Sequence, residues 1–389
     1  MDRATQAKHV SRLLELKRSS ASQLGPEPWA NPIDGYTRQD LLDLEVERLF
    51  RGLPLFAGLS CDVRERGEYF TFDAAGVPVL VVRGADGVLR AMHNVCRHRG
   101  APVVSGRGNL KDRMVCPYHG WTYDSSGKLV RWSHASGFEG LDAGRLGLTP
   151  LPVAEEHGVV YVRPIPGDPV DLAAALGGAE RELAPFDFER WHWIEERSNV
   201  RAMNWKLVVD TFMEAYHLPT LHRTTLAPMF EGQLSIFDAF GDNGRLIAAR
   251  RSISELESQS EAEWSLLPHC TVLWFLFPNV VFIYQQDHVE LWQVYPLEGS
   301  PDHSVAKVHL YAPEAVNDGS LARHLQKNMD LLMHVTNDED FDLGEQIQRG
   351  FHTAAQSTIV YGRNELGLTH YHQTIRRHLG LEPAPSEGR

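Results

Sequence analysis

The stretch NVCRHRGAPVVSGRGNLKDRMVCPYHGW, residues 94–121, contains two pairs of side chains that bind metals. Cys96 and His98 are separated by one residue, and Cys116 and His119 are separated by two. Zinc sites of this composition usually pair cysteine with cysteine and histidine with histidine, whereas each half here has one of each. The arrangement suits a [2Fe–2S] cluster in which one iron takes both thiolates and the other takes both imidazoles.

The residues around this motif predict a small all-β domain between about Leu53 and Arg163, because short β-rich runs alternate there with glycine-containing turns. Two neutral imidazoles in place of thiolates make the cluster less negative and raise its reduction potential. The chain resembles the Rieske iron–sulfur domain over roughly residues 50–165. The resemblance implies that this part of the protein accepts and passes on single electrons.

The composition of the whole chain limits its class. It has 389 residues, of which 43% are hydrophobic and 23% are charged, as expected for a globular protein with two domains. The formal net charge of -13 argues against nucleic-acid binding. We find no secretory leader and no uninterrupted apolar run long enough for a membrane helix, so we expect a protein of the reducing cytoplasm.

A second candidate metal site lies in NWKLVVDTFMEAYHLPTLHRTTL, residues 204–226, and the first part of this segment, residues 204–218, predicts a helix. Glu214 precedes His217 by three residues and would share its helical face. On an unbroken helix His222 would point about 140° away from His217. Pro219 would break the helix and let the chain bring the two imidazoles together.

A third ligand is expected from the acidic run NDEDFDLGEQIQRG, residues 337–350, within a helical stretch over residues 319–354. It offers Asp338, Glu339, Asp340 and Asp342. Two histidines and one carboxylate on one face of an iron leave open positions for dioxygen, as in the facial triad of non-haem iron oxygenases. The residue pattern alone leaves the choice of carboxylate open.

From about residue 45 to residue 375, the chain resembles the α subunit of the Rieske non-haem iron ring-hydroxylating oxygenases. In that family a helix carries Asn-Trp-Lys, then an acid three residues before the first iron histidine, and a second histidine five residues later. Residues 204–206, Glu214, His217 and His222 match this pattern position by position.

The same resemblance selects the carboxylate. The family's aspartate ligand is followed five residues later by Glu and then by Gln, which fits Asp340 with Glu345 and Gln348. Asp342 is the second choice. The resemblance therefore implies a mononuclear Fe(II) held by His217, His222 and Asp340.

The implied fold is α+β, with a small all-β Rieske domain and a catalytic domain of the helix-grip (START/Bet v 1-like) type with an antiparallel sheet. We expect a helix and arm over residues 1–45, the Rieske domain over 46–165, and the catalytic domain over 166–389. The proline-rich segment over residues 163–171 is the best candidate for a linker, since it cannot continue a strand or helix.

The implied function is that of a terminal oxygenase, which uses dioxygen to monooxygenate, dioxygenate or oxidatively demethylate a small organic substrate, with an aromatic compound the first expectation. Many ring dioxygenases have aspartate where this chain has Glu214. The glutamate looks more like family members that act on betaines or carnitine, so the alternative is a quaternary ammonium substrate. An alternative of another class is a Rieske electron-transfer protein without oxygenase activity.

The resemblance also implies partners. A reductase or ferredoxin would deliver electrons from NAD(P)H, and a homotrimer would pass them from His119 of one subunit through Glu214 to His217 of the next. Glu214 would then hold two imidazoles without binding metal. Residues 85–131 contain eight Lys or Arg against three acids, which would suit an acidic electron donor, although a solvated surface without a partner explains them equally well.

The substrate pocket is expected between the iron and the sheet, lined by aromatic side chains. Strand alternation allows only about half of a set of candidates to point inward. The candidates are Met213, Phe237, Trp274, Phe275, Phe277, Phe282, Tyr284 and Trp292.

Overall fold

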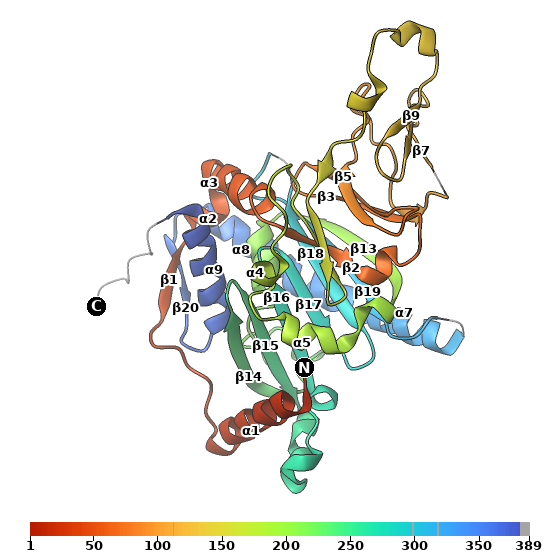
Figure 1. The fold of residues 1–389 in the computed structure, drawn as a ribbon. Helices are drawn as coiled ribbons and strands as arrows, with labels where there is room; N and C mark the ends of the chain where they lie inside the picture. The colour runs from red at the N-terminus through yellow and green to blue at the C-terminus, as the bar shows by residue number, and fades with distance from the viewer. Residues whose placement is uncertain (112, 298, 317–318, 382–389) are drawn as a thin grey trace. The chain divides into compact units, whose positions relative to one another are not determined.

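The computed structural model describes residues 1–111, 113–297, 299–316 and 319–381 (Figure 1). Internal contacts divide the chain into two compact units. The smaller unit comprises Val46–Ala175 and Asp187–Arg190, and the larger comprises Met1–Glu45, Leu176–Phe186 and Trp191–Arg389. In the described parts of the chain, no helix has both the length and the apolarity that crossing a bilayer requires.

The smaller unit is built from three antiparallel sheets. The five-stranded sheet has the order β10 (Pro150–Leu151), β5 (Leu89–His93), β4 (Pro78–Arg83), β3 (Glu68–Asp73), β6 (Arg107–Asn109). The two three-stranded sheets are β11 (Val153–Glu156), β12 (Val159–Val162), β2 (Leu55–Leu59), and β7 (Arg113–Val115), β8 (Thr122–Asp124), β9 (Leu129–Arg131). This is the small all-β domain that the sequence predicts.

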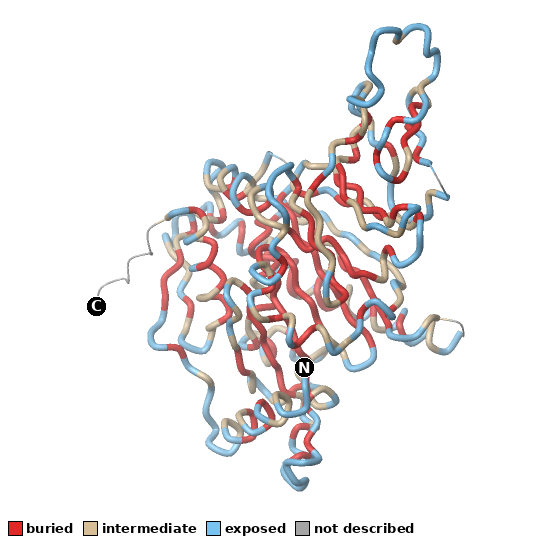
Figure 2. The backbone as a smooth tube through the Cα atoms, in the orientation of Figure 1, coloured by how far each residue is buried: buried red, intermediate tan, exposed pale blue. Residues whose placement is uncertain are grey.

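The larger unit is built around one seven-stranded antiparallel sheet. Its order is β13 (His192–Arg201), β19 (Ser304–Ala312), β18 (Val289–Pro296), β17 (Val280–Tyr284), β16 (Cys270–Leu276), β15 (Asn243–Arg250), β14 (Phe230–Phe240). A separate ribbon pairs β1 (Trp29–Pro32) with β20 (Thr358–Tyr361). Strands β16 and β18 are buried at every position, as Figure 2 shows for the centre of the sheet, because helices cover both faces.

The helices and helical turns connect and cover these sheets. The α-helices are α1 (Arg3–Ser19), α2 (Asp34–Thr37), α3 (Gln39–Glu45), α4 (Leu172–Leu176), α5 (Glu180–Leu183), α6 (Trp205–Asp210), α7 (Gly319–His334), α8 (Asp342–Phe351) and α9 (Leu366–Leu379). Two π-helical segments are η1 (Val46–Arg51) and η10 (Val335–Phe341). Short 3₁₀ turns are η2 (Ser60–Val63), η3 (Ala135–Phe138), η4 (Ala143–Arg145), η5 (Ala184–Phe186), η6 (Phe188–Arg190), η7 (Arg251–Ser258), η8 (Glu261–Glu263) and η9 (Leu267–His269).

Each face of the large sheet has its own cover. On one face Trp292 of β18 packs against Phe212, which follows α6, and against Phe341 of η10. On the other face Trp274 of β16 packs against Phe186, which follows α5. The all-β region predicted between about Leu53 and Arg163 and the helical stretch predicted over residues 319–354 are confirmed, the latter as the continuous run α7, η10, α8, which ends at Phe351. The α+β fold class is confirmed with them.

Candidate functional site

The two loops of the smaller unit that carry the Cys/His pairs have the same backbone turn. The N–H of Gly100 donates to the carbonyl of Cys96 at 2.9 Å, and the N–H of Gly120 donates to the carbonyl of Cys116 at 3.0 Å. Both glycines adopt positive φ, +82° and +70°, a conformation that side chains disfavour. The loops between β5 and β6 and between β7 and β8 therefore present their side chains in the same way.

The four candidate cluster ligands lie together, thiol beside thiol and imidazole beside imidazole. The rings of His98 and His119 are 4.6 Å apart between centroids, and the Nδ1 atom of His98 is buried without a hydrogen-bond partner. The thiols of Cys96 and Cys116 are buried as well. All four cysteines of the chain are described, and none forms a disulfide. This donor set fits a [2Fe–2S] cluster with two thiolate and two imidazole ligands.

The surroundings of these ligands favour a bound metal. Burial and the neighbouring Cys96 thiol raise the pKa of Cys116, so a thiolate there requires a nearby positive charge, which iron provides. Burial and the charge of His98 lower the pKa of His119, which leaves its imidazole neutral and able to bind metal. The ring of His98 stacks on Trp121 at 4.9 Å, and this contact fixes the orientation of the imidazole.

In the larger unit, the segment that carries the two candidate iron histidines is not a helix. Helix α6 begins after the N-cap Asn204 and ends at Asp210, and residues 211–229 form turns and bends. The carboxylate of Asp210 accepts hydrogen bonds from Tyr36 at 2.7 Å and from His372 at 2.8 Å. The predicted helix over residues 204–218 is therefore wrong beyond Asp210, and Pro219 is not the residue that ends it.

The turns nevertheless bring the two histidines together with one acid. The ring centroids of His217 and His222 are 5.0 Å apart. Oδ1 of Asp340 lies 3.0 Å from Nε2 of His222 and 3.7 Å from Nε2 of His217. The ligand atoms of these three residues lie within 4.8 Å of one another, an arrangement that suits a single metal ion. The donor set fits the facial triad of non-haem iron.

Each of the two imidazoles also contacts a glutamate through its Nδ1 atom, the ring nitrogen that faces away from Asp340. Glu214 contacts Nδ1 of His217, and Glu339 contacts Nδ1 of His222 while accepting a hydrogen bond from Thr225 at 2.8 Å. Such partners place the proton on Nδ1 and leave Nε2 free to bind a metal. The sequence indicated Glu339 only as one of four candidate iron ligands, and its contact with His222 was not expected. Its position beside Asp340 in the acidic run was the available signal.

Asp340 and Asp342 lie on either side of the end of η10 and have different surroundings. Asp340 is 7% exposed and lies beside the histidines, whereas the side chain of Asp342 is 58% exposed and pairs with Arg201 at 3.3 Å. The widened turn of η10 lets the adjacent residues Glu339 and Asp340 approach the same histidine, and π-helical turns are frequent at functional sites.

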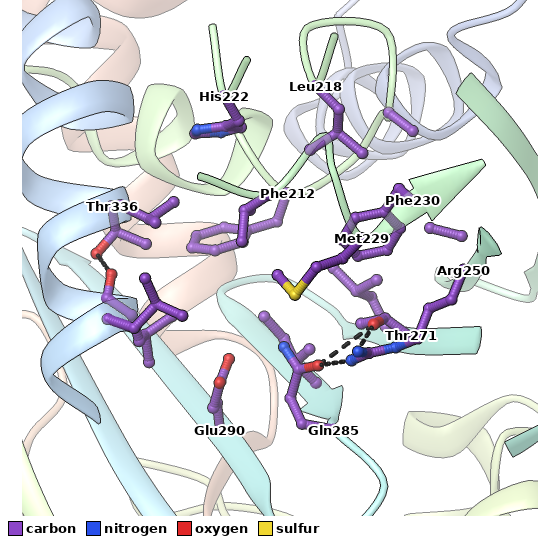
Figure 3. A pocket seen from close by; sticks show the side chains of 18 of the residues that line it. Phe212, Leu218, His222, Met229, Phe230, Arg250, Thr271, Gln285, Glu290 and Thr336 are labelled. Atoms are coloured by element: carbon purple, nitrogen blue, oxygen red, sulfur yellow. Dashed lines mark hydrogen bonds between the residues drawn. The ribbon is translucent and has the colours of Figure 1, made fainter. Parts of the chain in front are cut away.

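A cavity of about 300 Å³ adjoins this group of three residues. Its apolar wall includes Phe212, Met229, Phe230, Leu273 and Ile283. Its polar wall includes Arg250, Thr271, Gln285, Glu290 and Thr336, several of which come from the cavity-facing side of the sheet (Figure 3). The cavity has the size and mixed lining of a small-molecule site.

The side chains predicted to line the pocket, all of them described, lie elsewhere. Met213 and Phe237 line a smaller hollow, and Phe275 and Phe277 line another. Leu273 and Ile283 face the cavity, so by alternation Trp274, Phe282 and Tyr284 face the other side of the sheet. Trp292 is separated from the cavity by Phe212, whose ring packs on it at 5.3 Å. The candidates were selected mainly for their aromatic side chains, and the sequence alone does not show which face of the sheet each strand residue points to.

Segments of both units match known protein families. Residues 54–142 match the Rieske [2Fe–2S] domain, and residues 188–381 match the catalytic domain of the ring hydroxylating alpha subunit.

Relatives match along most of the chain. The oxygenase subunit of glycine betaine monooxygenase from Pseudomonas aeruginosa is 28% identical over 90% of each chain. The chloroplastic choline monooxygenase of Beta vulgaris is 29% identical over 88% of this chain and 75% of its own.

A solved quaternary ammonium Rieske monooxygenase shares the fold. It superposes with a TM-score of 0.75 at 22% identity, over 90% of this chain and 94% of its own. With both units matched, the chain belongs to the Rieske ring-hydroxylating oxygenases, as an α subunit that carries a Rieske [2Fe–2S] cluster and a mononuclear non-haem iron and uses dioxygen and reductase-derived electrons to oxidise a small organic substrate.

Proposed function

We propose that the protein is the oxygenase component of a monooxygenase that oxidises a quaternary ammonium compound. The similarity to the glycine betaine and choline enzymes supports this class. The cavity supports it as well, because Phe212 and Phe230 offer aromatic faces and Glu290 offers a buried carboxylate, and both attract a cation. These observations favour the quaternary ammonium alternative over the aromatic substrate that our sequence analysis put first.

The observation that carries the proposal is the convergence of His217, His222 and Asp340 on the wall of this cavity. In our proposal these three residues hold the mononuclear iron, which supplies dioxygen activation when bound. Glu214 and Glu339 keep the Nδ1 protons in place and so orient both imidazoles. The apolar wall excludes bulk water from the substrate.

In the same proposal Cys96, His98, Cys116 and His119 hold the Rieske cluster, and Glu214 passes electrons from it to His217. Glu214 is suited to this role because it contacts His217 and is partly exposed. We further propose a homotrimer, in which Glu214 would bridge His217 to His119 of the neighbouring subunit. The exposed Arg97 and Arg99 beside the cluster loop would favour an acidic ferredoxin or reductase as the electron donor.

The test of the function is a substrate screen with a surrogate reductase, in which oxygen consumption is compared with product formed. We expect quaternary ammonium compounds to give about one product per oxygen consumed, as coupled turnover requires. Oxidation of NADH without product would not count. Coupled turnover of an aromatic compound, with every quaternary ammonium compound inert, would contradict the proposal. About three irons per chain should be found, two in the cluster and one at the mononuclear site, whereas an electron carrier would hold about two.

The role of Glu214 has its own test. Glu214→Gln keeps the size of the side chain and removes its charge, so both metal sites should stay occupied while electron transfer between them slows by orders of magnitude. The measurement is a single turnover of pre-reduced enzyme with substrate and oxygen, following reoxidation of the cluster. The exposed Glu15, on α1, provides the control Glu15→Gln. Reoxidation of Glu214→Gln at the wild-type rate would exclude the bridging role.

A further inference from the structure

One charged group in the cavity lacks a full set of partners. Glu290 of β18 is 4% exposed, and its Oε2 atom is buried without a hydrogen-bond partner (Figure 3). Its Oε1 atom lies 3.4 Å from Nε2 of His288, which is a long contact for a charged pair. An ionised carboxylate that is buried and only partly paired is costly, and a positively charged ligand would relieve that cost.

The neighbouring His288 belongs mainly to another acid. Its Nδ1 atom lies 2.6 Å from Asp287, whose second oxygen lies 2.6 Å from Nε2 of His324. Burial opposes protonation, but the hydrogen bonds to Asp287 and Glu290 outweigh it and raise the pKa of His288 to about 9. At neutral pH the imidazolium of His288 therefore pairs with Asp287 at short distance, and its electrostatic interaction with the more distant Glu290 is weaker.

A positive group in the same cavity donates hydrogen bonds to neutral partners only. Arg250, at the end of β15, donates from Nη2 to Gln285 at 2.8 Å and to Thr271 at 3.1 Å, and both partners are neutral. Its Nε atom is buried without a partner. The charges of Glu290 and Asp287 act on the guanidinium, but neither carboxylate is among its hydrogen-bond partners in the described residues. Arginine stays protonated even when buried, so this charge is available to an anion.

We propose that the substrate is a zwitterion whose ammonium group binds Glu290 and whose carboxylate binds Arg250. The proposal rests on the quaternary ammonium function and narrows it from cations in general to the betaine type. At this end of the cavity Asp287 and Glu290 are matched in number by His288 and Arg250, and His324 lies beside the second oxygen of Asp287. A zwitterion preserves the balance, whereas a cation with a neutral tail leaves Arg250 without an anion.

Four small ligands of nearly the same shape test the two charges separately. Glycine betaine carries both charges, and choline carries the positive one alone. Replacing nitrogen by carbon gives 3,3-dimethylbutanoate, with the negative charge alone, and 3,3-dimethylbutanol, with neither. Calorimetric titration of the iron-loaded enzyme should show glycine betaine binding at least about tenfold more tightly than choline or 3,3-dimethylbutanoate, the size of effect expected for a charge pair removed from water.

Two substitutions assign each charge to its residue. Glu290→Gln should weaken glycine betaine and choline by about tenfold or more and leave 3,3-dimethylbutanoate within about twofold. Arg250→Gln should weaken glycine betaine and 3,3-dimethylbutanoate and spare choline, while Arg250→Lys, which keeps the charge, should retain most of the affinity. Glu15→Gln is the control for removal of an acid outside the cavity. The absorbance of the Rieske cluster and the iron content verify that each variant is folded.

The outcomes separate this inference from the proposed function. Choline bound as tightly as glycine betaine would overturn the zwitterion inference and leave the quaternary ammonium function in place. The same holds if Arg250→Gln binds all four ligands as the wild type does. Failure of all four ligands to bind would overturn the zwitterion inference, whereas the proposed function is overturned only if every quaternary ammonium compound in the substrate screen is inert. The ligand comparison on the unaltered enzyme needs no variant, so the inference stays testable if a substitution prevents folding.

Discussion

Replacing Glu339 by glutamine should weaken iron binding without touching any of the three residues that we propose as iron ligands. The carboxylate contacts Nδ1 of His222 and accepts a hydrogen bond from Thr225 at 2.8 Å. These contacts fix the ring of His222 so that its Nε2 atom faces Asp340 at 3.0 Å. Glutamine can still accept a hydrogen bond from Nδ1, but it lacks the negative charge that makes the imidazole a stronger ligand.

The expected loss of iron affinity depends on which contacts of Glu339 the glutamine can keep. Removing a carboxylate that orients a metal-bound histidine typically lowers metal affinity by about 10- to 100-fold. That range corresponds to about 1.4 to 2.7 kcal/mol. Because glutamine keeps one hydrogen bond, we expect Glu339→Gln near tenfold and Glu339→Ala near the upper limit. The Rieske cluster, bound in the other unit, should be unaffected.

The assay is an anaerobic titration of iron-depleted protein with Fe(II) against a competing chelator, with the visible spectrum of the Rieske cluster recorded in parallel. Asp338 provides a matched control because it is the preceding acid in the same run, is 64% exposed and pairs only with the exposed His334 among the described residues. Asp338→Asn should bind iron as the wild type does. The reasoning fails if Glu339→Gln keeps wild-type affinity, or if Asp338→Asn loses as much.

Three further predictions concern other parts of the chain. Cys116→Ser should abolish the absorbance and EPR signal of the Rieske cluster, and a full-strength signal would refute the ligand assignment. Asp340→Ala should lose mononuclear iron and turnover with the Rieske spectrum intact, while Asp342→Ala keeps both; the reverse pattern would show that Asp342 is the ligand. Burial lowers the pKa of His9 from 6.5 to about 4, so the unfolded chain binds a proton more readily than the folded chain does. The free energy of unfolding should therefore fall by on the order of 3 kcal/mol as the pH drops from 6.5 to about 4. Urea unfolding at several pH values should show this loss in the wild type and not in His9→Gln, and equal slopes would contradict it.

The two metal sites differ in how far the sequence predicts them. Both Cys/His pairs lie within residues 94–121, on loops whose turns depend on Gly100 and Gly120, so spacing along the chain already indicates the donor set. The candidate iron site joins His217 and His222 to an acid that lies more than a hundred residues further along the chain. For this site the sequence limits the candidate carboxylates to a few residues of one acidic run, and the geometry of η10 determines which of them lies beside the histidines.

Local sequence predicts the mixed α and β structure of this protein, the four candidate cluster residues and the acidic run that offers a candidate iron ligand, because strand periodicity, helix periodicity and ligand spacing act over short distances along the chain. Tertiary structure alone decided that α6 ends at Asp210, where Tyr36 and His372 hold the carboxylate, and that Glu339 contacts His222. It also decided the lining of the cavity. A side chain's direction on a strand depends on register, and register depends on pairing with distant strands, so no local pattern could reveal that Glu290 faces inward and Trp274 away.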